Sequence, residues 1–181
     1  HAVYGSGRMY NMCYKVAYEK NAQKLHDALV DLGFRGILYN DVYSIVPPTV
    51  CCDPNHPVTS KDAQMWGYKT LEDGARKLGG VASEGGYDHF ASILDYCLYA
   101  IFSDSYENVN VKPMRDAYVP LWHIVYNGTI LSCPVSSCVN YTVKEPDVAM
   151  KQLEYGGHPT YYFYSAHRDD AANWMGGRTK T

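Results

Sequence analysis

The sequence predicts an α/β fold, in which helices alternate with the short strands of a largely parallel sheet. Two observations indicate this class. Apolar residues recur at helical spacing over residues 18–32, and short apolar runs follow each predicted helix, at residues 34–39 and 81–83. A parallel sheet whose strands are joined by crossover helices accommodates that alternation. The 181 residues correspond to a single domain.

The first half of the chain contains two helix–strand units. Leu25, Ala28, Leu29 and Leu32 give the helix over 18–32 its apolar stripe, and the strand over 34–39 ends at Asn40-Asp41. A loop with four prolines follows over residues 44–60. The second helix is predicted over residues 60–78, with Ser60 as its N-cap. Its expected buried stripe consists of Met65, Tyr68, Leu71, Ala75 and Leu78. The strand over 81–83 then ends at Glu84.

The second half is read in the same way. We expect strands over residues 92–96, 119–126 and 160–164, a helix over 146–155 and a polar tail over 167–181. Five strands are fewer than the eight of a (β/α)₈ barrel, which needs about 250 residues. Residues 2–4 read like the middle of a strand. The sequence therefore predicts that residues 1–166 form the C-terminal portion of a (β/α)₈ barrel whose early strands are missing.

Composition narrows the class of partner. The formal net charge of −3 argues against a nucleic-acid or anionic-membrane binder. There is neither an apolar run long enough to span a membrane nor an opening signal peptide, and compartment and oligomeric state stay open. Eighteen tyrosines suit a polar ligand such as a sugar, although composition alone favours the simpler explanation of a tyrosine-rich core and surface.

The six cysteines include no Cys-x-x-Cys pair, which disfavours a structural zinc site. Cys13 and Cys97 stand in apolar surroundings and are expected to be buried. Cys133 and Cys138 are close enough in sequence to close a small disulfide loop. Asp53 and His56 in the proline-rich loop lack further ligands at a metal-binding spacing, so we expect no metal and no cofactor.

Two carboxylates carry the strongest functional signal. Asp41 and Glu84 each end a predicted strand, on what look like neighbouring strands of a parallel sheet. Strands about 4.8 Å apart would bring the carboxyl groups within the ~5–5.5 Å that a retaining glycosidase needs. The competing interpretation makes Asp41 a cap or turn residue and Glu84 a salt-bridged loop residue.

A resemblance strengthens the catalytic interpretation. Residues 36–43 (Gly-Ile-Leu-Tyr-Asn-Asp-Val-Tyr) and 79–85 (Gly-Gly-Val-Ala-Ser-Glu-Gly), with Trp66 on the helix between them, resemble the catalytic core of endo-α-N-acetylgalactosaminidase-type glycoside hydrolases. These are families 101 and 129 and a related bacterial group of barrel proteins. The likeness extends over roughly residues 20–130 and implies that Asp41 is the nucleophile and Glu84 the acid/base. The loop that carries Pro47 and Cys51 departs from the family pattern, which leaves the sugar open.

Further candidates would bind the substrate. Tyr39 and Tyr43 flank Asp41, and Tyr126 ends the strand predicted over 119–126. Asp95 could hydrogen-bond sugar hydroxyls, or be a structural carboxylate. Trp66 is a sugar platform or part of a helix core. The remaining alternative is a cysteine nucleophile at Cys97, which lacks a partner histidine at a motif spacing.

The sequence thus predicts a retaining glycosidase that acts without a cofactor on an α-linked hexose or N-acetylhexosamine. A carbohydrate-binding barrel without catalysis and an inactive piece of a glycosidase are the alternatives.

Overall fold

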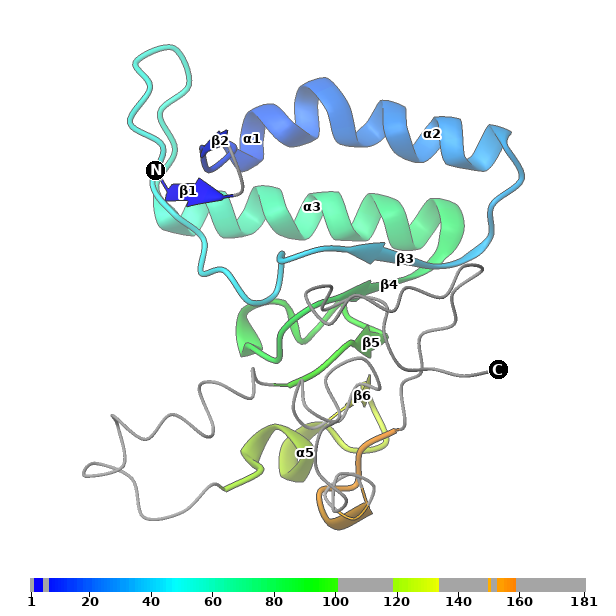
Figure 1. Cartoon of the computed structure of the whole chain (residues 1–181). Helices are drawn as coiled ribbons and strands as arrows, with labels where there is room; N and C mark the ends of the chain where they lie inside the picture. The colour runs from blue at the N-terminus through cyan, green and yellow to red at the C-terminus, as the bar shows by residue number, and fades with distance from the viewer. Residues whose placement is uncertain (1, 5–6, 101–118, 134–149, 151–152, 159–181) are drawn as a thin grey trace, which may run out of the picture. The chain divides into compact units, whose positions relative to one another are not determined.

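The computed structural model of the chain describes residues 2–4, 7–100, 119–133, 150 and 153–158. Two compact units are distinguished, one of residues 1–39 with 46–81 and one of residues 40–45 with 82–181. Figure 1 labels β1 (Ala2–Tyr4), β2 (Gly7–Met9), α1 (Tyr14–Ala17), α2 (Gln23–Asp31), β3 (Gly36–Asn40), α3 (Ser60–Leu78), β4 (Gly79–Ser83), β5 (Tyr96–Cys97), α5 (Leu121–Tyr126) and β6 (Leu131–Ser132). Two further short helices are η1 (Tyr18–Ala22) and η2 (Asp88–Phe90).

The principal sheet has the strand order β3-β4-β5-β6. β4 pairs with β5 in parallel, with Ala82 opposite Tyr96 and Ser83 opposite Cys97, and β5 pairs with β6 in parallel. The predicted mixture of helices and parallel strands is therefore confirmed. Closure into part of a (β/α)₈ barrel stays a prediction. β1 and β2 form a separate antiparallel pair, which confirms the strand expected at residues 2–4.

In the first unit, one helical run through α1, η1 and α2 lies along α3 (Figure 1). The stripe predicted for this run is wrong at Leu25, Ala28 and Leu32, which are exposed. His26 is buried instead. The His26 Nδ1 atom lies 2.9 Å from a carboxylate oxygen of Asp73 on α3, which Lys77 and Arg76 also contact. A buried hydrogen bond between His26 and Asp73 thus selects the face of the run that packs.

α3 has the predicted bounds, with a different cap. Thr59 is the N-cap, and its side chain accepts a hydrogen bond from the Asp62 amide. Gly79 ends the helix with a φ of 122°, a conformation that glycine adopts without strain. Met65 is exposed, contrary to the predicted stripe. The buried residues of α3 are Ala63, Gly67, Thr70, Leu71, Asp73, Gly74 and Leu78.

Two strands predicted in the second unit are wrong. Residues 92–95 precede the short strand β5 and do not belong to it. The stretch predicted as a strand over 119–126 contains the helix α5, so Trp122 and His123 are neighbours that are both buried, where strand alternation would separate them. Met150 and residues 153–154 are helical, and the rest of the predicted helix over 146–155, apart from Tyr155, lies outside the described residues, as do the strand over 160–164 and the tail.

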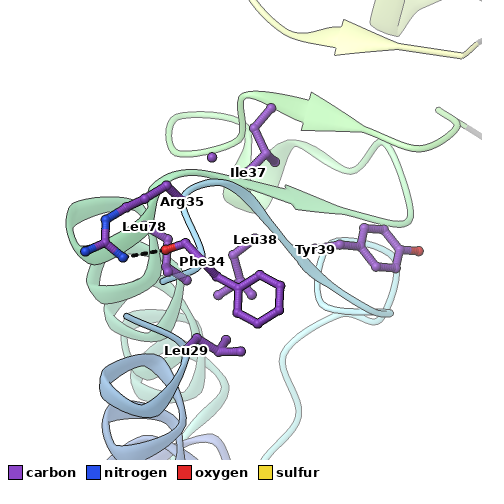
Figure 2. Close-up of a pocket in the computed structure, with 8 residues that line it drawn as sticks. Leu29, Phe34, Arg35, Ile37, Leu38, Tyr39 and Leu78 are labelled. Carbon is purple, nitrogen blue, oxygen red and sulfur yellow. Dashed lines mark hydrogen bonds between the residues drawn. The ribbon is translucent and has the colours of Figure 1, made fainter. Parts of the chain in front are cut away.

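The first unit has an apolar pocket of about 120 Å³, lined by residues of α2, β3 and α3. Figure 2 shows Leu29, Phe34 and Leu38 gathered together there, whereas the Tyr39 ring points away from them. The pocket has no carboxylate in its lining. Within the described part of the chain, no helix is both long and apolar enough to cross a membrane.

Candidate active site

Asp41 and Glu84 occupy equivalent positions in the fold. Asp41 directly follows β3, and Glu84 directly follows β4, its neighbour in the sheet. Both residues belong to the second unit. Asp41 is exposed, whereas Glu84 is half-buried. The two carboxyl groups therefore differ in solvent exposure. Such a difference in environment commonly gives two catalytic carboxyl groups different protonation states and different roles.

The Glu84 carboxyl group is held by neighbours on both sides. The Tyr99 hydroxyl, just beyond β5, donates a hydrogen bond to Glu84 Oε1. The backbone amide of Val42, the residue after Asp41, also donates to this carboxyl group. Burial and the negative charge of Asp41 raise the pKa of Glu84, and these hydrogen bonds only partly offset the rise.

The backbone at Val42 is strained. Its φ of 55° lies in the left-handed region, and Val42 is the non-glycine residue with a positive φ among those described. A β-branched residue in this conformation is an outlier that costs roughly 1–3 kcal/mol and persists only where its surroundings enforce it. In this conformation the Val42 amide donates its hydrogen bond to Glu84. The strained residue therefore follows one carboxylate in the chain, Asp41, and contacts the other, Glu84.

Two buried serines fix the loop that carries Asp41. The Ser83 hydroxyl donates to the Asn40 carbonyl (2.6 Å) and accepts from the Ser44 amide (3.0 Å). The Ser44 hydroxyl accepts from the Gly85 amide (3.1 Å). The loop over residues 40–45 is thereby joined to the end of β4 on either side of Glu84.

The two glycines after Glu84 permit close backbone packing. A Cβ atom on Gly85 would lie 2.6 Å from Ile45 Cγ1, and one on Gly86 would lie 2.7 Å from Ala100 Cα. The Gly86 amide donates to the Ala100 carbonyl (2.9 Å). Side chains would separate these segments, so Gly85 and Gly86 keep Glu84 close to the loop over 40–45 and to the segment after β5.

Tyr43 packs near this site. Its ring centroid lies 6.4 Å from that of Phe90, and its backbone carbonyl accepts a hydrogen bond from the His89 ring. Burial lowers the pKa of His89, although this hydrogen bond and the charge of Asp88 oppose the change. His89 is therefore predominantly neutral near pH 7.

The other predicted substrate-binding residues are distributed differently. Tyr39 lines the apolar pocket of the first unit. Trp66, also in the first unit, packs against Tyr18, with ring centroids 5.7 Å apart. Lys69 Nζ lies 4.3 Å from the ring centroid of Trp66. The interpretation of Trp66 as a helix packing residue accounts for these contacts.

Asp95 was predicted to lie within a strand and Tyr126 to end one, and neither prediction is correct. Asp95 precedes β5, at the amino end of that strand, and Glu84 lies at the opposite edge of the parallel sheet. Tyr126 ends the helix α5, which precedes β6, and its ring packs on Trp122 with centroids 4.4 Å apart. Both residues are left out of the candidate site.

Four residues of the site were not predicted from the sequence: Tyr99, Val42, Ser44 and Ser83. A signal for Tyr99 was present, because the apolar run over residues 96–100 marks a strand that begins four residues later than the one predicted. The serines carry no sequence signal of their own.

Cys97 lies beneath the site as a buried thiol. Its Sγ lies 3.1 Å from the Tyr99 carbonyl oxygen, and burial raises the pKa of Cys97 to about 12. A protonated thiol is a poor nucleophile, which argues against the cysteine alternative. Cys133 is buried, and Cys138, with which it was predicted to form a disulfide, lies outside the described residues.

Comparison with solved structures finds a likeness over most of the chain. The ligand-free α-N-acetylgalactosaminidase NagBb of Bifidobacterium bifidum aligns with a TM-score of 0.67 at 22% identity, covering 92% of this chain and 27% of that one. Its complex with GalNAc aligns with a TM-score of 0.57 at 21% identity, and its complex with Gal-NHAc-DNJ with 0.61 at 22%; each covers 73% of this chain and 21% of that one.

The likeness is one of fold. It confirms the resemblance that was inferred from the two motifs. At 20–22% sequence identity, it shows a shared architecture. The chain spans about a quarter of the length of that enzyme. No family model and no curated protein matches the sequence.

Proposed function

We propose that the protein is a retaining glycoside hydrolase, in which Asp41 is the nucleophile and Glu84 the acid/base. The observation that carries the proposal is the Glu84 carboxyl group, whose pKa is raised by burial and by the charge of Asp41. A general acid must keep its proton until the leaving oxygen needs it, and a raised pKa provides this. The exposed Asp41 is suited to the ionised role.

The reaction has two steps. The Asp41 carboxylate attacks the anomeric carbon while Glu84 gives its proton to the departing glycosidic oxygen, and a covalent glycosyl ester forms. The Glu84 carboxylate then removes a proton from water, which attacks the same carbon and releases Asp41. Two inversions leave the anomeric configuration unchanged.

The comparisons support a class of substrate to test. The similar solved structures are of an α-N-acetylgalactosaminidase, including complexes with GalNAc and Gal-NHAc-DNJ. We therefore propose α-linked N-acetylgalactosamine as the first sugar to test, and an α-linked hexose as the second. Tyr43, beside Asp41 in sequence, is the tyrosine that we propose to contact the sugar.

The test compares two isosteric variants of the full-length protein on aryl α-glycosides. Asp41→Asn should abolish turnover of every substrate, because no nucleophile remains. Glu84→Gln should strongly reduce turnover of substrates with poor leaving groups, whereas phenols that leave without a proton should still be expelled in the first step. Full activity of the Asp41→Asn variant would contradict the proposal.

A binding function gives a different pattern. A carbohydrate-binding barrel would show saturable sugar binding in calorimetry but no turnover, and both variants would bind as the unmodified protein does. That result would mean that the protein binds the sugar without hydrolysing it.

A further inference from the structure

Three potential metal ligands meet in the first unit. Cys51 and His56 are near one another in sequence, and Cys13 is distant from both. The Sγ atoms of Cys13 and Cys51 and a ring nitrogen of His56 lie within 4.8 Å of one another. Cys51 Sγ lies 3.3 Å from His56 Nδ1. In a tetrahedral zinc site, bonds of about 2.3 Å to sulfur and 2.0–2.1 Å to nitrogen place such ligand atoms about 3.6 Å apart. The three side chains thus have the spacing of a thiolate–imidazole site.

The segment that carries two of these ligands is a closed hairpin. Cys51 and Val58 exchange backbone hydrogen bonds of 2.8 and 3.0 Å, which form an antiparallel bridge. Between them, the His56 amide donates to the Asp53 carbonyl (3.1 Å), and Pro54 and Pro57 restrict the backbone further. Cys51 and His56 are therefore positioned before any ion binds.

Asp53 orients the imidazole. One Asp53 carboxylate oxygen lies 3.4 Å from His56 Nε2, the ring nitrogen opposite the one that faces Cys51. A carboxylate at one ring nitrogen holds the proton there and leaves the lone pair of the other nitrogen for a metal, the usual arrangement around a metal-bound histidine.

Cys13 supplies the third ligand from another part of the chain. It is half-buried, where the sequence predicted burial, and its sulfur lies beside that of Cys51. Cys13 is the N-cap of the helical run that starts with α1, and its side chain makes no capping hydrogen bond. A divalent cation between the two sulfurs would bind both of them as thiolates.

We propose that Cys13, Cys51 and His56 bind one zinc-class divalent cation, with Asp53 as the residue that positions the imidazole. Binding converts two thiols into thiolates and releases two protons. The ion would join the hairpin over residues 51–58 to the start of the helical run, and its fourth coordination position would be open to water. From the sequence, Asp53 and His56 were considered for a metal and set aside, because the other ligands, Cys13 and Cys51, follow no metal-binding spacing.

Cobalt titration of the reduced full-length protein tests the proposal, because cobalt–thiolate bonds absorb in the near ultraviolet. One equivalent of Co²⁺ should produce this band, and Zn²⁺ should displace it. Cys13→Ser, Cys51→Ser and His56→Asn should each abolish stoichiometric binding. Asp53→Asn should weaken it by about 10–100-fold, the loss typical when a residue that supports a ligand is removed.

Cys52→Ser is the matched control, because Cys52 is exposed and lies outside the cluster. It should bind cobalt as the unmodified protein does, and circular dichroism should show that every variant is folded. Loss of binding in Cys52→Ser equal to that in Cys51→Ser would overturn the assignment. So would a folded, reduced protein that binds no cobalt, with Cys13 and Cys51 instead recovered as a disulfide by peptide mapping.

Discussion

Tyr99 donates a hydrogen bond from its phenol to the Glu84 carboxyl group, across the carboxyl ends of β5 and β4. The bond links the candidate general acid to the neighbouring parallel strand. It favours the ionised form of Glu84, whereas burial and the charge of Asp41 favour the protonated form. The pKa of Glu84 therefore reflects opposing contributions, and a single substitution that removes one of them should shift it.

Tyr99→Phe should shift the pH profile of the enzyme. The substitution removes a hydrogen bond that lowers the pKa of Glu84, so this pKa should rise further. Because the acid is active when protonated, the basic limb of kcat/KM should move to higher pH. Tyr68→Phe, the same change on α3, should leave the profile unchanged. A shift of the basic limb to lower pH would contradict the role given to Tyr99.

Ser83→Ala should lower both stability and turnover. The Ser83 hydroxyl donates to the Asn40 carbonyl and accepts from the Ser44 amide. Its removal takes one hydrogen-bond partner from each of these backbone groups. The free energy of unfolding should fall by about 1–3 kcal/mol in urea denaturation. Because the loop with Asp41 is released, kcat should fall as well. Ser92→Ala, at an exposed position, should change neither, and equal effects of the two variants would refute this account.

Val42→Gly should relieve the strained backbone between the two carboxylates. The strain costs roughly 1–3 kcal/mol, whereas glycine costs about 0.5–1 kcal/mol through its greater freedom in the unfolded chain. Val42→Ala keeps the unfavourable φ and is the matched control. The glycine variant should therefore have the higher melting temperature of the two. The reverse order would mean that the left-handed conformation is not enforced.

Asp73→Asn should remove part of the acid sensitivity of the fold. Burial raises the pKa of Asp73, but hydrogen bonds from His26, Lys77 and Arg76 outweigh it and lower the pKa below 3.8. Its stabilisation is thus present above the unfolded pKa of about 3.9 and is lost as pH falls through the folded value. The variant should be less stable at pH 7, by up to about 3–5 kcal/mol.

The measurement is the free energy of unfolding between pH 7 and pH 2. The difference between Asp73→Asn and the unmodified chain should shrink as the pH falls below 4. Asp31→Asn, at an exposed position of α2, serves as the control and should follow the unmodified chain. A constant difference across this range would show that the ionisation of Asp73 does not stabilise the fold.

The elements around the two carboxylates could be predicted because local signals agree there. Gly79 stops α3, short apolar strands follow, and Asp41 and Glu84 end those strands as expected. The second unit was harder. An apolar run such as residues 119–126 suits a buried strand and a buried helix equally, and only its place between the parallel strands β5 and β6 requires a helix.

Contacts between distant residues could not be predicted. The burial of His26 depends on Asp73, which is 47 positions away, and the position of Glu84 depends on Tyr99 and Val42. Periodicity reports which face of an element is apolar. It does not report where a polar group finds its partner.

The central claim is that Asp41 forms a covalent bond with the sugar. The Glu84→Gln variant lacks the base that activates water, so an aryl α-N-acetylgalactosaminide with a good leaving group should glycosylate the protein faster than water releases it. Mass spectrometry of the intact protein should show the added sugar, and peptide mapping should locate it on Asp41. Steady turnover with the sugar attached to another residue, or with no adduct at any time, would contradict the account.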